Sequence, residues 1–392
     1  MGEEAFAYDA SRIKVLEGRH AIRKRPGMYV GSTGERGLRQ TVFDLADRAV
    51  NEVLTGSATR LGITFLSDGG VRVDDDGPGV PVEAAGHTGG PGLETLLTQP
   101  FTGPDTSGRH GLTSGLVGVG PCVTNALSSR LTAEVRRDGT RWVQEYAHGA
   151  ALTPPAAVGP ASGSGTTFTF RPDADIFETT EFVFGVFVER FRELAFLYRD
   201  LDVSLTDERT PGEPRSVRFR FPDGVREFVA FLDAEAETAR TAGTAGPAGT
   251  AVDPDVIAFE RDTPEATVDV ALRWSDSHEE RVRGFANGVP TLEGSTHLLG
   301  FRDGLAAAVH AYARERRLLT AADPGPSADR IARGLTAVVS VKLDRPEFLG
   351  ATRGTLGNPA ARPCVAETVR DHLGVWFAEQ PERAGALVGR LL

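Results

Sequence analysis

The stretch TVFDLADRAVNEVLTG, residues 41–56, decides how the rest of the chain can fold. Its apolar side chains recur at helical intervals and cover more than half of the circumference, which predicts a helix buried on most sides. Asp44, Arg48 and either Asn51 or Glu52 are spaced to share one face of this helix. Polar groups on a mostly buried helix need partners or a ligand. The simpler alternative is a solvated stripe that carries an Asp44–Arg48 ion pair.

The composition is that of an ordinary globular protein with about two domains in its 392 residues. A formal net charge of −11 argues against a dedicated nucleic-acid surface. The two cysteines, Cys122 and Cys364, cannot form a disulfide framework, which favours a reducing cytoplasm. The N-terminus lacks a secretory signal, and no apolar run is long enough to span a bilayer. We therefore expect a cytoplasmic protein that does not contact membranes.

The order of the predicted elements in the first half favours a two-layer α/β sandwich. After the helix at 41–56, two strands flank a hairpin signal at 68–70. Turn residues and alternating apolar residues then predict further strands and two helices. The predicted strands are 59–66, 71–73, 131–136, 141–146, 163–170 and 201–205, and the helices are 122–127 and 186–196.

Two glycine-containing segments of this half suggest a ligand site. Asp75 follows a strand and precedes Gly77 and Gly79, so that backbone can approach a flat ligand while the carboxylate accepts a hydrogen bond from it. The run SGLVGVG, residues 114–120, opens the helix at 122–127, as a phosphate-binding loop does. Each signal is weak alone. An acidic turn and a flexible loop are the alternatives.

The second half predicts a smaller sheet with long helices. Residues 237–253, rich in Ala, Gly and Thr, are interpreted as a flexible surface loop without chemistry. His297, before the long helix, is interpreted as a capping or packing residue rather than a catalyst. The predicted strands are 256–259, 266–274, 280–286 and 335–342, and the helices are 225–232, 298–319 and one beginning at 365.

Several collinear segments resemble the ATPase region of the DNA gyrase B family, in the GHKL superfamily. The resemblance implies an α+β fold, in which a GHKL (Bergerat) two-layer α/β sandwich at 1–220 precedes a transducer domain of ribosomal-S5-like β-α fold at 221–392. The TOPRIM and DNA-cleavage domains of the family are not expected in these residues. The matching segments are YDASRIKVLEG, RKRPGMYVGSTGERGL, DDGPGVP, SGLVGVG, NALS, RRDG, GSGT, AFLYRDL, LTDER, LTAVVSVKL and LGN.

The resemblance implies roles for individual residues. Asp75 matches the aspartate that hydrogen-bonds the adenine amino group, and Thr166 matches the threonine that assists it through water. Tyr8 matches the tyrosine of an N-terminal arm that reaches the nucleotide of a dimer partner. Arg137 matches an arginine at the pocket mouth, where aminocoumarin inhibitors bind. The other implied nucleotide contacts are Gly77, Gly79, Val80, Pro81, Gly115, Leu116, Val117, Gly118, Val119 and Gly120.

At several site positions the chain departs from the family pattern. Asp44 replaces the catalytic glutamate and withdraws the carboxylate by one methylene; a displacement near ~1 Å can cost about a hundredfold in rate. Arg48 replaces the magnesium-binding asparagine, and a guanidinium cannot ligate a cation. Arg48 can contact the phosphates instead, while the neighbouring Asp47 is retained. Arg353 replaces the transducer lysine that reaches the γ-phosphate and keeps its charge.

These observations leave two functional hypotheses. The first is an ATP-binding and ATP-hydrolysing clamp of a type II topoisomerase, with weakened hydrolysis, Asp44 and Arg353 as catalytic residues and no metal ligand at position 48. It would dimerise through the N-terminal arm and bind DNA only in a larger complex with A-type or B-type gyrase subunits. The alternative is a catalytically degenerate module that binds nucleotide, a gyrase subunit or an aminocoumarin-like inhibitor. Neither hypothesis includes DNA cleavage by this chain.

Overall fold

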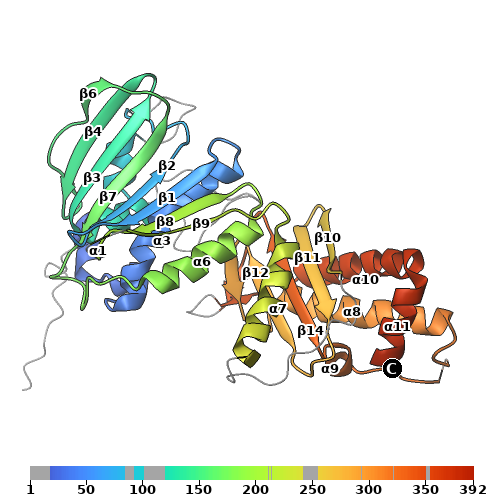
Figure 1. Ribbon diagram of the computed structural model, residues 1–392. Helices are drawn as coiled ribbons and strands as arrows, with labels where there is room; N and C mark the ends of the chain where they lie inside the picture. The colour runs from blue at the N-terminus through green and yellow to red at the C-terminus, as the bar shows by residue number, and fades with distance from the viewer. Residues whose placement is uncertain are drawn as a thin grey trace, which may run out of the picture.

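Two α/β units lie side by side in the computed structural model (Figure 1). The first carries the larger sheet, and the second carries a smaller sheet with long helices. The structure describes residues 18–83, 92–100, 120–210, 212, 214–241, 255–292, 294–320, 322–349 and 354–392.

Within the described residues, the first sheet has nine strands in the order β5-β4-β3-β7-β2-β1-β8-β9, with β6 paired to β4. Neighbouring strands are antiparallel except β1 and β8, which run parallel. The strands are β1 (Arg60–Phe65), β2 (Val71–Asp75), β3 (Ser128–Arg137), β4 (Thr140–Ala147), β5 (Ala150–Ala151), β6 (Ala156–Pro160), β7 (Gly165–Pro172), β8 (Asp202–Asp207) and β9 (Arg215–Phe219).

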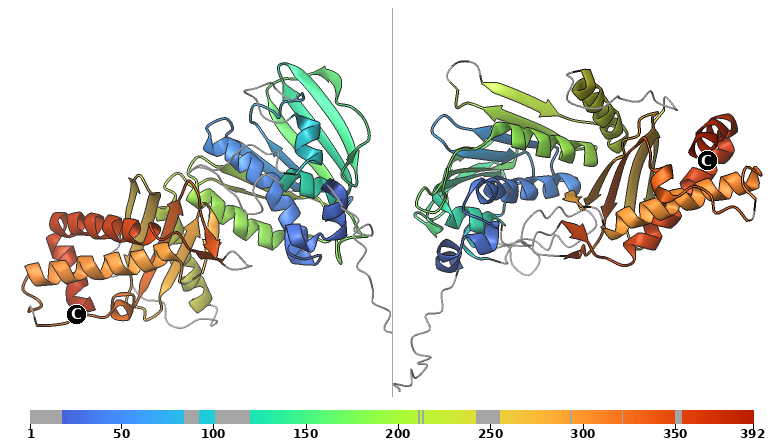
Figure 2. Two further views of the ribbon diagram at one scale, coloured as in Figure 1. Left: turned by 180° about the vertical axis from the view of Figure 1, so that it is seen from behind. Right: turned by 90° about the horizontal axis from the view of Figure 1, so that it is seen from below.

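The helices of the first unit form a layer on one face of this sheet (Figure 2). Helix α3 packs against α5 and against β1 and β2. Phenylalanines fill the space between α3, β1 and α6, where the Phe187 ring lies 5.5 Å from Phe43 and 4.9 Å from Phe65. The helices are α1 (Gly18–Lys24), α2 (Gly27–Val30), α3 (Glu35–Leu54), α4 (Leu93–Thr98), α5 (Gly120–Ala126) and α6 (Phe184–Leu197).

The second sheet, as far as the described residues go, has five strands in the order β10-β11-β14-β12-β13. Nearly every side chain of the central strands β11 and β14 is buried. Because successive side chains of a strand point to opposite faces of the sheet, both faces are covered. Ala271 and Val338 join the core of the first unit, whereas their neighbours Val270 and Val339 join the core under α8 and α10. The strands are β10 (Ile257–Asp262), β11 (Thr267–Trp274), β12 (Arg281–Ala286), β13 (Val289–Thr291) and β14 (Leu335–Lys342), and a separate hairpin pairs β15 (Phe348–Leu349) with β16 (Thr355–Leu356).

Helices cover both faces of the second sheet. Helix α7 packs on β11 and β14 and meets α6, while α8 and α10 pack on each other over the opposite face. No helix in the described ranges combines the length and apolarity needed to cross a membrane. The helices are α7 (Val225–Thr241), α8 (Thr296–Glu315), α9 (Ala328–Ile331), α10 (Ala361–Glu379) and α11 (Pro381–Leu391).

Aromatic rings join the two units at α6 and α7. Phe196 of α6 stacks on Phe221 at 3.7 Å and on Phe228 of α7 at 4.7 Å between ring centroids. Phe228 in turn lies 5.8 Å from Phe285 of β12. A cavity of about 210 Å³ opens beside these rings, between α6, α7 and β12. The junction therefore combines stacked rings with a partly open cavity that charged side chains such as Glu193 and Arg283 also line.

The predicted α+β fold is confirmed, and most predicted elements are present with small shifts of their ends. The site helix begins at Glu35, before the predicted residue 41. The prediction of a loop from residue 237 is wrong for its first residues, because α7 continues to Thr241. Residues 234–237 read AEAE, and both Ala and Glu are strong helix formers that carry the helix forward. Residues 242–254 lie outside the described residues, and the boundary at 220 stays a prediction.

Helix α3 should depend for its stability on its apolar face. Leu45, which is fully buried, is expected to lower the free energy of unfolding by about 2–5 kcal/mol when changed to alanine, because the change leaves a cavity. Leu152 is 49 % exposed, and Leu152→Ala should change the stability by less than about 0.5 kcal/mol. Urea unfolding of both variants followed by circular dichroism tests this. Equal losses would show that α3 is not part of the core.

Candidate functional site

Helix α3 positions the polar residues of the candidate site. Its buried residues include Val42, Leu45, Ala49 and Val50, which pack it into the first core. Arg48 and Glu52 lie toward the end of β2 and the turn after it, and Asp44 lies against the start of α5. These three residues follow one another at intervals of four, so they lie one turn apart on one face.

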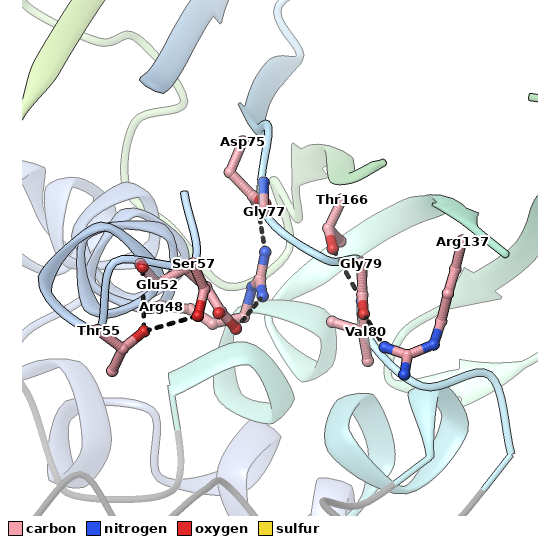
Figure 3. Close-up of polar contacts among 10 residues, drawn as sticks. All are labelled: Arg48, Glu52, Thr55, Ser57, Asp75, Gly77, Gly79, Val80, Arg137 and Thr166. Carbon is pink, nitrogen blue, oxygen red and sulfur yellow. Dashed lines mark hydrogen bonds and ion pairs between the residues drawn. The ribbon is translucent and has the colours of Figure 1, made fainter. Parts of the chain in front are cut away.

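The centre of the site is an ion pair between Arg48 of α3 and Asp75 at the end of β2 (Figure 3). One guanidinium nitrogen donates to Asp75 Oδ2, and another donates to Glu52 Oε1 at 3.4 Å. The side chains of Arg48 and Asp75 are 10 % and 2 % exposed, so this pair is shielded from water. Asp75 Oδ1 also accepts a hydrogen bond from the Gly77 amide at 3.0 Å. Both carboxylate oxygens of Asp75 are therefore engaged.

The turn after Asp75 is held close to the sheet by three contacts. Asp76 accepts hydrogen bonds from the amide and hydroxyl groups of Thr59. The Val80 amide donates to Thr166 Oγ1 at 3.1 Å, and Arg137 Nη1 donates to the Gly79 carbonyl at 2.6 Å (Figure 3).

Gly79 cannot be replaced without strain in this turn. Its φ is +77°, and a Cβ there would lie 2.7 Å from the Arg136 carbonyl. Asp75 and Thr166 are cross-strand neighbours of β2 and β7, so the sheet register brings them together. The structure thus gathers Asp75, Thr166 and the glycine turn, with Val80 buried and Pro81 half-buried beside it.

Asp44 lies at the other end of the polar face. Its side chain is buried and accepts a hydrogen bond of 2.7 Å from Gln40 Nε2. Burial raises the pKa of Asp44 to about 7, the Gln40 hydrogen bond opposes this, and the charge of Asp47 adds to the rise. Gly120 packs on Asp44 so closely that a Cβ at this glycine would lie 3.1 Å from Asp44 Cβ. The end of the glycine run and Asp44 are therefore in contact.

The alternative of an Asp44–Arg48 ion pair is wrong. Among the described residues, Arg48 pairs with Asp75 and Glu52, and Asp44 is bound by Gln40 instead. The sequence pattern assigns no role to Gln40 and places Glu52 only on the shared face of the helix. Their i−4 and i+4 spacing from Asp44 and Arg48 was the signal that could have found both contacts.

Asp47 acts electrostatically on α6 as well as on Asp44. Burial lowers the pKa of Arg190, and the negative charge of Asp47 opposes this shift. Burial raises the pKa of Tyr198, and the charge of Asp47 adds to this rise. Arg190 belongs to α6, and Tyr198 is its C-cap residue. The predicted site residues Tyr8, Gly115, Leu116, Val117, Gly118, Val119 and Arg353 lie outside the described residues.

The donor set beside Arg48 does not fit a magnesium ion. The guanidinium pairs with the two carboxylates next to it, and its positive charge would repel a cation. No group of three or more acidic, histidine or cysteine side chains in the described part of the chain is arranged to hold a metal. His297 is fully buried, and burial lowers its pKa to about 3, which suits a packing residue.

Comparisons with known proteins show the family of the chain. Residues 33–176 match the model of histidine kinase-, DNA gyrase B- and HSP90-like ATPases, and residues 224–392 match the DNA gyrase B model. The crystal structure of the 43K ATPase domain of Thermus thermophilus gyrase B, in complex with an aminocoumarin, is 31 % identical with a TM-score of 0.78. The alignment covers 95 % of this chain and 93 % of that one. The chain belongs to the DNA gyrase B family.

Full-length relatives are more similar in sequence. The novobiocin-sensitive DNA gyrase B protein of Streptomyces niveus is 40 % identical over 99 % of this chain, and the novobiocin-resistant protein of the same organism is 41 % identical over 97 %. The chain spans 58 % and 57 % of the lengths of these relatives. The similarity to these relatives therefore covers only part of their length, the part that contains the ATPase and transducer region.

The buried Asp44 should make the stability of this gyrase B family chain depend on pH. Its pKa is 3.8 for the free side chain and about 7 in the folded state. Between these values the folded state holds a proton that the unfolded state has lost, so the free energy of unfolding falls as pH rises to about 7. Asp44→Asn should weaken this fall and be more stable than the wild type above about pH 7.

Urea midpoints at about pH 5, 6, 7 and 8 measure this difference. The control is Asp276→Asn, at an exposed position, which should follow the wild-type profile. Groups such as Asp269, whose pKa burial raises to about 6, contribute equally to all three proteins and cancel in the comparison. Parallel profiles for wild type and Asp44→Asn would contradict the prediction.

Proposed function

We propose that this chain is the nucleotide-binding clamp module of a type II topoisomerase of the gyrase B class, with weakened ATP hydrolysis. The observation that carries the proposal is the convergence of Asp75, Thr166 and the glycine turn at 77–79 behind one buried helix. A buried carboxylate suits the amino group of adenine, and the glycines let a flat base approach the backbone. Family membership supports ATP as the ligand.

Two features of the site support slow hydrolysis. Asp44 is one methylene shorter than the glutamate of the family and is partly protonated near pH 7, since burial raises its pKa to about that value. A protonated carboxyl cannot accept a proton from water. Arg48 removes the position where the family holds a metal, so the charge of the phosphate tail would be met by guanidinium groups such as Arg48.

The wider assembly is proposed from the relatives. Dimerisation through the N-terminal arm, with Tyr8 reaching the nucleotide of the partner, and association with gyrase A-type or B-type subunits are proposals for this chain. DNA would be contacted only within that larger complex, because the net charge of −11 does not favour a nucleic-acid surface on this chain alone.

A binding module without hydrolysis is the second candidate. Arg48 favours it, because its guanidinium pairs with Asp75 and Glu52 and cannot ligate the metal that assists hydrolysis in the family. The ligand of such a module could be an aminocoumarin, as in the Thermus thermophilus structure. Arg137, which holds the Gly79 carbonyl, stands at the predicted binding position for that class. Turnover separates the two candidates.

Phosphate release should be slow in the wild type and should increase when the family residues are restored. We expect Asp44→Glu combined with Arg48→Asn to gain magnesium-dependent turnover of about a hundredfold over wild type, because it restores both the reach of the carboxylate and a metal ligand. Asp44→Ala is the control for contaminating activity. Efficient wild-type turnover that Asp44→Ala abolishes would refute weakened hydrolysis, and wild-type turnover equal to this control would favour the binding module.

Nucleotide affinity should depend on Asp75 and not on magnesium. Titration calorimetry with a non-hydrolysable ATP analogue is expected to give dissociation constants within about threefold with magnesium and with EDTA. Asp75→Ala should weaken binding by at least about tenfold, since a hydrogen bond to a charged group contributes about 1.5–3 kcal/mol. Asp68→Ala, at the partly exposed tip of the same hairpin, is the matched control. Tight binding that requires magnesium would contradict the assignment of Arg48.

A further inference from the structure

Arg48 lies between the two ends of the candidate pocket. Asp75, the proposed base-binding carboxylate, lies at one end, and Asp44, in contact with Gly120, lies at the other. Arg48 is one helical turn from Asp44 on the same face of α3. The backbone of Arg48 therefore lies one turn from Asp44, which contacts Gly120. Its guanidinium lies at the other end, beside Asp75.

The guanidinium covers the group that a base would need. Asp75 gives one oxygen to the Gly77 amide and the other to Arg48, and only 2 % of its side chain remains exposed (Figure 3). An adenine amino group can reach this carboxylate only when the ion pair opens. Binding of a base and pairing of Arg48 with Asp75 therefore compete.

The same guanidinium is incompletely satisfied where it lies. Its Nε is buried and has no hydrogen-bond partner among the described residues, and its Nη1 contact with Glu52 is long at 3.4 Å. The Phe168 ring, 5.6 Å away, offers only a weak cation–π contact. A phosphate group could accept hydrogen bonds from two guanidinium nitrogens at once. Arg48 therefore has a favourable alternative partner in a nucleotide but not in a nucleoside.

We propose that Arg48 makes the pocket select phosphorylated ligands, by exchanging its ion pair with Asp75 for the phosphates when a nucleotide binds. The proposal rests on the nucleotide-binding function proposed above. Adenosine must break the ion pair and leaves the buried guanidinium with only its long contact to Glu52, which is unfavourable. ATP breaks the same pair and supplies the replacement. Arg48, which pairs with the base-binding carboxylate when no ligand is bound and contacts the phosphates when a nucleotide binds, then makes the site selective for phosphorylated ligands.

Titration calorimetry of the full chain with ATP and with adenosine tests this. For the wild type, we expect adenosine to bind at least about a thousandfold more weakly than ATP. In Arg48→Ala and Arg48→Gln the ratio should fall to about tenfold or less, because adenosine gains access to Asp75 while ATP loses a phosphate contact. The glutamine variant removes the positive charge that pairs with Asp75 but keeps part of the side chain that packs in the site, so it remains informative where the alanine variant folds poorly.

Arg72→Ala is the matched control, since Arg72 is exposed on β2 and lies outside the site, and its ratio should equal that of the wild type. An unchanged ratio of adenosine to ATP affinity in both Arg48 variants would overturn the role of Arg48 and leave the proposed function intact. Failure of every protein to bind ATP at millimolar concentration would overturn the proposed function and this inference together.

Discussion

The buried carboxylate of Asp75 is the constraint on which the site depends. A charge in this position must be paired, because an isolated ion in a low-dielectric interior is costly. Here the partner is Arg48, held by a helix whose apolar face anchors it in the first core. Around the end of β2 lie the glycine turn, Thr166 and Arg137. The architecture of the gyrase B family is kept, while the charge at its centre is changed.

The change at position 48 alters what the site can do with a nucleotide. An asparagine offers an oxygen to a metal, whereas an arginine offers only donors. Electrostatic stabilisation of the phosphates is still possible, but it comes from the protein itself. The same residue pairs with Asp75, so under the proposed function recognition of the base and of the phosphates is linked. Weak catalysis and selective binding can thus follow from one substitution.

The site helix is also coupled to α6. Asp47 influences Arg190 and Tyr198 of that element electrostatically, and α6 contacts α7 through the stacked rings of Phe196 and Phe228. The ring of Phe228 also lies beside the ring of Phe285 in the second sheet. Neighbouring side chains thus connect the site helix with α6 and with the second sheet.

The sequence by itself determined the α+β fold, most of the longer strands and helices, and the family, because periodicity and turn residues act locally and the matching segments are long. The continuation of α7 to Thr241 was missed because the Ala, Gly and Thr content suggested a loop, although the Ala and Glu residues at 234–237 favour a helix. Only the tertiary structure decided the partner of Arg48, because Asp75 lies 27 residues away and is reached only when β2 packs under α3. The raised pKa of Asp44 likewise depends on burial. Pairing and desolvation are properties of the assembled core, and no local pattern encodes them.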